Sequence, residues 1–174
     1  MSMRHRSELK PEQVWAWLAE VGDPEIPVIS VVDLGIVRDV VVCPSGQPGC
    51  VITITPTYSG CPAMQVIAES IEGTLKRHGI EQVRIETRLS PAWTTDWMSA
   101  AGKEKLKGYG IAPPAQQVID ISGISRRSQA QAKVACPLCN SRHTRLISQF
   151  GSTACKALYR CDDCLEPFDY FKCH

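Results

Sequence analysis

The placement of the cysteines is the strongest constraint on how this chain can fold. Six of its nine cysteines lie in the last quarter of the 174 residues, and four of these form two C-x-x-C pairs, Cys136 with Cys139 and Cys161 with Cys164. Two such pairs can bind one tetrahedral metal ion, because each lies on a tight turn and the segment between them can form a hairpin. A module of this size buries too small a core to fold alone, so a metal would supply much of its folding free energy. We therefore predict a zinc-ribbon module over residues 134–174.

The same pattern leaves the identity of the metal open. Zinc is the first expectation, but iron held by the same four thiolates would make the module a rubredoxin-like electron carrier. Cys155 and Cys173 remain outside the two pairs, and each is a candidate for an extra ligand, a group beside the metal or an ordinary buried thiol. The alternative of four free thiols in an unfolded tail conflicts with the aromatic residues of "FDYFKCH" (168–174), which are typical of a packed core.

The bulk composition argues against several classes of protein. The formal net charge is +1, with 44% hydrophobic and 21% charged residues, which is ordinary for a globular protein. This charge argues against nucleic acid as a partner, although five basic residues of the second half could contact phosphate groups: Arg126, Arg127, Lys133, Arg142 and Arg145. No secretory signal and no run of about 18 apolar residues is visible. We expect a cytoplasmic protein that binds neither membranes nor nucleic acid.

The first part of the chain alternates between helix and strand patterns. Apolar spacing and turn residues predict helices over 11–21, 61–78 and 94–110, the last capped by Thr94 or Thr95 and interrupted by Gly102, and strands over 36–43, 50–56 and 81–91. The first two strands should form a hairpin. We predict an α/β (α+β) fold in which a small three-stranded sheet is covered by helices. Residues 8–111 would form this domain, and the proline-, serine- and glutamine-rich residues 112–133 would form a linker to the cysteine-rich module.

Cys61 lies between Gly60 and Pro62, where the strand pattern gives way to the helix pattern. If Cys61 caps the helix and Pro62 occupies its first position, the unpaired N–H groups of the helix end should lower the pKa of the thiol. That placement predicts a reactive or metal-binding cysteine, whereas an inert buried thiol is the simpler alternative.

Further polar residues follow predicted helices and strands, where binding sites are often built. Asp23, Glu25 and Asp33 belong to "GDPEIP" and "VDLG", and each could equally serve as a local cap or turn residue. The segment "PAWTTDW" (91–97) is a candidate pocket wall or docking face, with core packing as the alternative. We find no nucleophile–base–acid set, phosphate-binding glycine loop or dinucleotide motif, so we do not expect catalysis by this chain alone.

The segments "DPEIPVISVVDLGIV", "TPTYSGCP", "PAWTTDW", "YGIAPP" and the cysteine-rich tail together resemble the PaaD family of phenylacetate-degradation proteins. The resemblance extends over essentially the whole chain. Residues 8–111 also resemble a wider family of SufT-like iron–sulfur assembly factors, which share the "DPE", "DLG" and "GCP" segments.

The resemblance implies a role beside the multicomponent phenylacetyl-CoA 1,2-epoxidase, a di-iron oxygenase served by a reductase with flavin and an iron–sulfur cluster. It implies that Cys61 handles iron or a transient cluster, with Asp23, Glu25 and Asp33 in the acidic motifs of the family. The expected function is assembly or insertion of the iron–sulfur or iron cofactor, with the reductase or the oxygenase as partner. A cluster shared across a homodimer is compatible with a single thiolate per chain. The alternative is a structural or electron-carrying subunit of the epoxidase.

Overall fold

The structure is a computed structural model that describes residues 9–43, 49–114 and 134–172. The chain divides into two compact units, Met1–Gly102 and Lys103–His174, and each is described by itself. No helix in the described ranges is long and apolar enough to cross a membrane.

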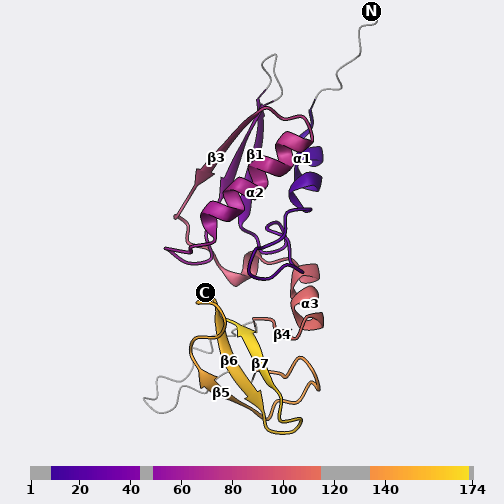
Figure 1. Ribbon diagram of the computed structural model, residues 1–174, viewed down its shortest axis with the longest axis vertical. Coiled ribbons are helices and arrows are strands. Elements are labelled where there is room, and N and C mark those ends of the chain that lie inside the picture. Colours follow the sequence, from indigo (N-terminus) through magenta and orange to yellow (C-terminus); the bar gives the residue numbers. More distant parts are fainter. Residues whose placement is uncertain (1–8, 44–48, 115–133, 173–174) are drawn as a thin grey trace, which may run out of the picture. The chain divides into compact units, whose positions relative to one another are not determined.

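The N-terminal unit is built around a three-stranded sheet (Figure 1). Its elements are α1 (Pro11–Leu18), β1 (Val37–Cys43), β2 (Gly49–Ile54), α2 (Met64–Arg77), β3 (Gln82–Thr87) and the 3₁₀ helix η1 (Thr95–Trp97). β1 pairs with β2 in antiparallel fashion, and β2 pairs with β3 in parallel, so α2 is the crossover between two parallel strands. The predicted hairpin and the small sheet with helices are therefore confirmed.

The core of this unit lies between the sheet and the two helices. Ile67, Ile71 and Leu75 recur along one face of α2 and are fully buried, as the helical spacing predicts. α1 contacts α2 and β1, and α2 contacts β3. The candidate site residues lie outside the helices and strands: Asp23, Glu25 and Asp33 precede β1, and Cys61 precedes α2.

The start of α2 differs from the prediction. The helix begins at Met64, with Ala63 as its N-cap, rather than at Cys61. Cys61 instead lies in a turn, where its N–H donates to the Tyr58 carbonyl at 3.2 Å and its own carbonyl accepts from the N–H of Met64 at 3.3 Å. Pro62 and Ala63 form a turn that precedes the helix.

The predicted helix over 94–110 is two elements. η1 is capped by Thr94, whose hydroxyl accepts from the N–H of Asp96 at 3.2 Å, and α3 (Ala100–Gly108) follows after an extended Met98. Gly102 does not interrupt the helix. It lies inside α3, where a side chain would approach the Cβ of Asp33 to 3.0 Å, so the glycine permits close packing.

The C-terminal unit contains a second sheet of four strands (Figure 1). Its strands are β4 (Ile111–Ala112), β5 (Thr144–Ser148), β6 (Lys156–Cys161) and β7 (Pro167–Phe171), in the order β4-β7-β6-β5. β5, β6 and β7 form an antiparallel ribbon, and β4 adds to it in parallel with β7. The small core consists of Ala112, Val134, Cys136, Ala157, Cys161, Phe168 and Tyr170. Most of the predicted linker lies outside the described residues.

Candidate functional site

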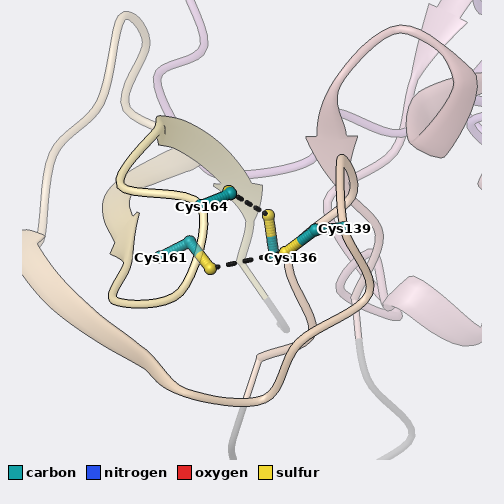
Figure 2. Close-up of side chains that lie close together, drawn as sticks. All are labelled: Cys136, Cys139, Cys161 and Cys164. Atoms are coloured by element: carbon teal, nitrogen blue, oxygen red, sulfur yellow. Dashed lines mark hydrogen bonds between the residues drawn. The ribbon is translucent and has the colours of Figure 1, made fainter.

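The four cysteines of the two pairs converge in the C-terminal unit (Figure 2). Cys136 and Cys139 precede β5, whereas Cys161 ends β6 and Cys164 lies in the turn before β7. Their four sulfur atoms all lie within 4.8 Å of one another, with 3.8 Å between Cys136 and Cys164 and 3.5 Å between Cys139 and Cys161. The two sequence pairs thus form one group that could hold a single metal ion.

This arrangement fits a tetrahedral thiolate site. Zinc–sulfur bonds of about 2.3 Å in a tetrahedron place the sulfur atoms about 3.8 Å apart, close to the two distances above. Cys155 does not belong to the group: it is buried in the turn before β6, and its sulfur lies 3.0 Å from the hydroxyl of Thr153. Cys173 lies outside the described residues. Zinc in this site would hold the turns before β5 and β7 together.

The two cysteine turns share one backbone design. In each, the N–H of the first cysteine donates to the carbonyl five residues later, from Cys136 to Ser141 at 2.8 Å and from Cys161 to Glu166 at 3.0 Å. The residue after each second cysteine has a positive φ, 62° at Asn140 and 67° at Leu165. Backbone N–H groups in the second turn, that of Cys164 above all, lower the pKa of Cys161 to about 7. Burial and contacts with the neighbouring sulfur atoms raise the pKa of Cys139 and Cys164, so without a metal the fold favours thiolate at Cys161 alone among these three.

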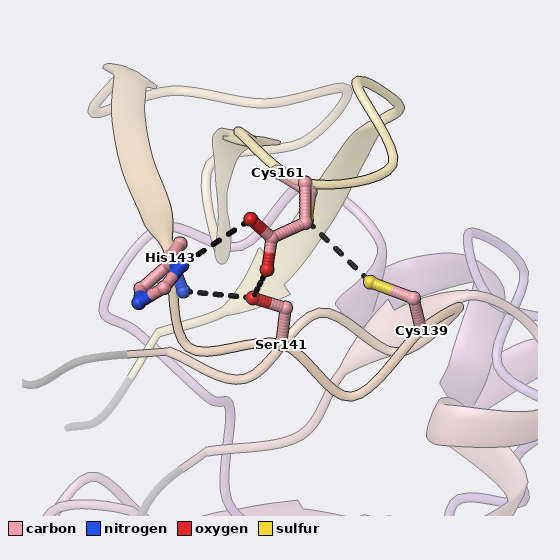
Figure 3. Close-up of polar contacts among 5 residues, drawn as sticks. Cys139, Ser141, His143 and Cys161 are labelled. Atoms are coloured by element: carbon pink, nitrogen blue, oxygen red, sulfur yellow. Dashed lines mark hydrogen bonds and ion pairs between the residues drawn. The ribbon is translucent and has the colours of Figure 1, made fainter.

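A polar network joins the two turns (Figure 3). Asp163, between the cysteines of the second pair, accepts a hydrogen bond from the hydroxyl of Ser141 and lies 3.2 Å from Nδ1 of His143. These contacts lower the pKa of Asp163, the Ser141 bond first. His143 is thus a neighbour of the four-cysteine site. Sequence analysis missed Ser141 and Asp163, although both lie within or next to the C-x-x-C pairs.

Cys61 has a different environment in the N-terminal unit. Its side chain is partly buried, and burial raises the pKa of the thiol, while the carboxylates of Glu25 and Asp23 raise it further. Hydrogen bonds from the N–H of Ala63 and the hydroxyl of Tyr58 lower the pKa, but the net shift is upward. The expected lowering of this pKa is therefore wrong, because burial and the two carboxylates outweigh the N–H of Ala63 and the hydroxyl of Tyr58. The structure does bring Cys61 within electrostatic range of two of the predicted acidic residues.

Asp23 and Asp33 also have roles in the backbone. One carboxylate oxygen of Asp23, which is 8% exposed, accepts from the N–H groups of Glu25 and Ile26, both at 2.8 Å. Asp33 accepts from the hydroxyl of Ser99 at 2.6 Å, and its carbonyl accepts from the N–H of Ser99 at 2.9 Å. Asp33 is not among the groups that shift the pKa of Cys61. It joins the "VDLG" segment to the residues after η1.

The "PAWTTDW" segment is mainly a packing element. Trp93 is 3% exposed and donates from its indole N–H to the carbonyl of Leu34 at 2.9 Å. Trp97 is partly exposed, with the guanidinium of Arg38 lying 3.6 Å from its ring centroid. The backbone of Trp97 approaches Gly35, which has a φ of 70° and leaves no room for a Cβ. The alternative of core packing thus describes Trp93, whereas Trp97 lies at the surface.

Comparisons with known proteins match both parts of the chain. Residues 11–86 match the family described as "Iron-sulfur cluster assembly protein", and residues 122–172 match the "PaaD zinc beta ribbon domain". The chain is 49% identical over 174 residues to the Escherichia coli K12 protein named as the D component of a 1,2-phenylacetyl-CoA epoxidase, covering 98% of this chain and 99% of that protein. The zinc-ribbon match and the four-cysteine cluster together support zinc binding.

Two further relatives cover the N-terminal part. The Bacillus subtilis 168 protein named "Fe-S protein maturation auxiliary factor YitW" is 32% identical over 100 residues, covering 57% of this chain and 95% of that protein. The crystal structure of a domain of unknown function, DUF59, from Bacillus anthracis superposes with a TM-score of 0.51 at 28% identity, covering 55% of this chain and 90% of that one. With an iron–sulfur assembly domain followed by a zinc-ribbon domain, and near-complete coverage of its Escherichia coli relative, this chain belongs to the PaaD family of phenylacetyl-CoA epoxidase components.

Proposed function

We propose that this protein assists the assembly or insertion of the iron–sulfur or iron cofactor of a phenylacetyl-CoA epoxidase. Cys61, with Glu25 and Asp23, would hold the iron or cluster as cargo, and the four-cysteine unit would be a zinc-stabilised docking module. The client would be the iron–sulfur reductase or the di-iron oxygenase of the complex. The names of the Escherichia coli and Bacillus subtilis relatives support this combination of roles.

The observation that carries the proposal is the grouping of one thiol with two carboxylates. A permanent iron–sulfur cluster generally has four cysteine ligands, so one thiolate per chain is an incomplete set. An incomplete set of ligands binds iron or a cluster less tightly, as transfer to a client protein requires. The raised pKa of Cys61 acts in the same direction, because a proton competes with iron for the sulfur at neutral pH.

The first test measures the cargo on this protein. Anaerobically purified native protein and Cys61→Ala would be analysed for zinc, iron and acid-labile sulfide, with Cys43→Ala as the matched control, since Cys43 is also a partly exposed cysteine of this unit. We expect zinc near one per chain in all three, and iron or sulfide in the native and Cys43→Ala proteins only. Iron at equal levels in all three would contradict a role for Cys61.

The second test measures the client. The epoxidase components would be produced with native protein, with Cys61→Ala, or without either, and their iron and sulfide content would be compared. We expect a shortfall in the last two cases. A fully loaded and active epoxidase made without this protein would overturn the proposal.

A second candidate function rests on the four-cysteine site itself. The same four sulfur atoms could hold iron, which would make the protein an electron-carrying subunit of the epoxidase. Such a protein would be coloured and redox-active, and it would comigrate with the other subunits at a fixed ratio. A colourless protein with zinc alone would exclude the carrier.

A further inference from the structure

A pocket lies in the C-terminal unit beside the first cysteine turn. Its volume is about 240 Å³. One side is formed by Cys136, Pro137 and Asn140 of the turn, and another by Pro113 and Pro114, which follow β4. The pocket therefore exists only where the edge strand and the first cysteine turn are both folded.

The residues that line the pocket are mainly apolar, with two exposed cations. Val134 and Tyr170 are buried, and prolines in the wall carry no backbone N–H that would attract a polar ligand. Lys107 and Arg142 are exposed, and within the described ranges neither has an ion-pair partner. Two cations without carboxylate partners beside an apolar wall are complementary to an anionic group attached to an apolar one.

We propose that this pocket binds an acidic segment of a protein partner, in which a carboxylate side chain is adjacent to an apolar side chain. The carboxylate would contact Lys107 and Arg142, and the apolar side chain would cover the prolines and Tyr170. The volume lies below the roughly 300–1,000 Å³ of pockets for cofactors and drug-sized ligands, so it suits one or two side chains. The proposal extends the docking role suggested above for this unit, and rests on it.

The pocket is coupled to the metal site through the backbone. The N–H of Cys136 donates to the carbonyl of Ser141 at 2.8 Å, and the carbonyl of Cys136 accepts from the N–H of Asn140 at 2.9 Å. Cys136 is thus both a ligand of the four-sulfur site and part of the pocket wall. Binding of the acidic segment should therefore require the metal-loaded turn.

The test uses the zinc-loaded full-length chain and the peptide Leu-Glu-Phe-Glu, amidated at its C-terminus and carrying an uncharged fluorophore, with Leu-Gln-Phe-Gln in the same form as its uncharged partner. Anisotropy at physiological salt should show at least about fivefold tighter binding of the acidic peptide. Lys107→Glu and Arg142→Glu should each weaken that binding about fivefold, because each removes one attraction and adds one repulsion. Lys103→Glu makes the same charge change on α3 outside the pocket and should leave the affinity unchanged. Removal of zinc by a chelator should abolish binding.

Several results would overturn the proposal. Equal affinity for the two peptides would remove the role of the carboxylate, and an equal effect of Lys103→Glu would show that net charge alone is responsible. Tighter binding of a single-stranded RNA oligonucleotide than of the acidic peptide would show that Lys107 and Arg142 bind phosphate groups rather than carboxylates. Circular dichroism and zinc content would verify that each variant folds. Cys61→Ala separates the two proposals: it should bind the peptide normally while failing to load the epoxidase.

Discussion

The two units of this chain present cysteine in opposite ways. The C-terminal unit holds four sulfur atoms in one cluster, on two turns of the same design. The N-terminal unit offers one partly buried thiol beside carboxylates that raise its pKa. A complete, pre-arranged ligand set favours permanent binding, whereas a single protonated thiol favours exchange. The difference between the units lies in the number of sulfur atoms brought together, four in one cluster against one thiol beside carboxylates, and not in the presence of cysteine itself.

The largest expected effect is the loss of a ligand from the four-cysteine cluster. Cys161→Ser should release zinc and unfold the C-terminal unit, since this unit has only a small core, and zinc affinity should fall by more than about a hundredfold. Zinc analysis would measure the release of the metal, and near-ultraviolet circular dichroism would measure the unfolding. Cys43→Ser is the matched control in the other unit. If Cys43→Ser released as much zinc as Cys161→Ser, the metal would not be specific to the four-cysteine cluster.

A smaller effect is expected from the network between the two turns. Asp163→Asn removes the carboxylate that joins the two cysteine turns through Ser141 and His143, and zinc affinity should fall about tenfold, the lower end of the effect known for groups that bond to metal ligands directly. Competition with a chromophoric chelator measures the affinity. The control is Asp162→Asn, since Asp162 is paired with Arg145 on the surface and should matter little. Equal losses in the two variants would show that charge near the site, and not the network, is responsible.

A substitution at Leu165 would measure the backbone strain in the second cysteine turn. Its φ is 67°, a conformation that side chains other than Gly, Asn and Asp rarely adopt, and its side chain is 60% exposed. Leu165→Asn gives the second turn the residue type that Asn140 supplies in the first, and should stabilise the unit by about 1 kcal/mol. Thermal denaturation of the zinc-loaded protein measures this. A lower midpoint would mean that the leucine side chain contributes packing that outweighs the strain.

The smallest effect concerns the reactivity of Cys61. Because burial and the neighbouring carboxylates raise its pKa, alkylation by iodoacetamide should show a midpoint above that of a free cysteine, with little reaction near neutral pH. Glu25→Gln removes one of these charges, lowers the pKa and should speed alkylation near neutral pH a few-fold. Peptide mapping by mass spectrometry would follow Cys61 alone. If Glu81→Gln, a charge change at another site, gave the same increase, the local effect of Glu25 would be refuted.

Much of the fold could be predicted because its signals are local. Alternating strands, the helical face of Ile67, Ile71 and Leu75, and the two C-x-x-C pairs each depend on residues close in sequence. The predicted start of α2 was wrong by a few residues: Pro62 suits a first helical position, but the structure places it in a turn before the helix.

Other features depend on contacts between distant segments. The bonds of Asp163 to Ser141 and of Asp33 to Ser99 join residues far apart in sequence, and no local pattern indicates them. β4 consists of two residues, too few to show any alternation, so only its pairing with β7 identifies it as a strand. The same long-range placement put Glu25 and Asp23 beside Cys61, which spacing alone could not establish.

β4 has a practical consequence for anyone who cuts this protein into pieces. The zinc-ribbon family match begins at residue 122, but the strand that covers the edge of β7 is Ile111–Ala112. A fragment beginning at residue 122 would leave the backbone N–H and C=O groups along that edge unpaired. Exposed edges of this kind add strands from other molecules, which leads to aggregation. A fragment intended for solution work should therefore begin before residue 111.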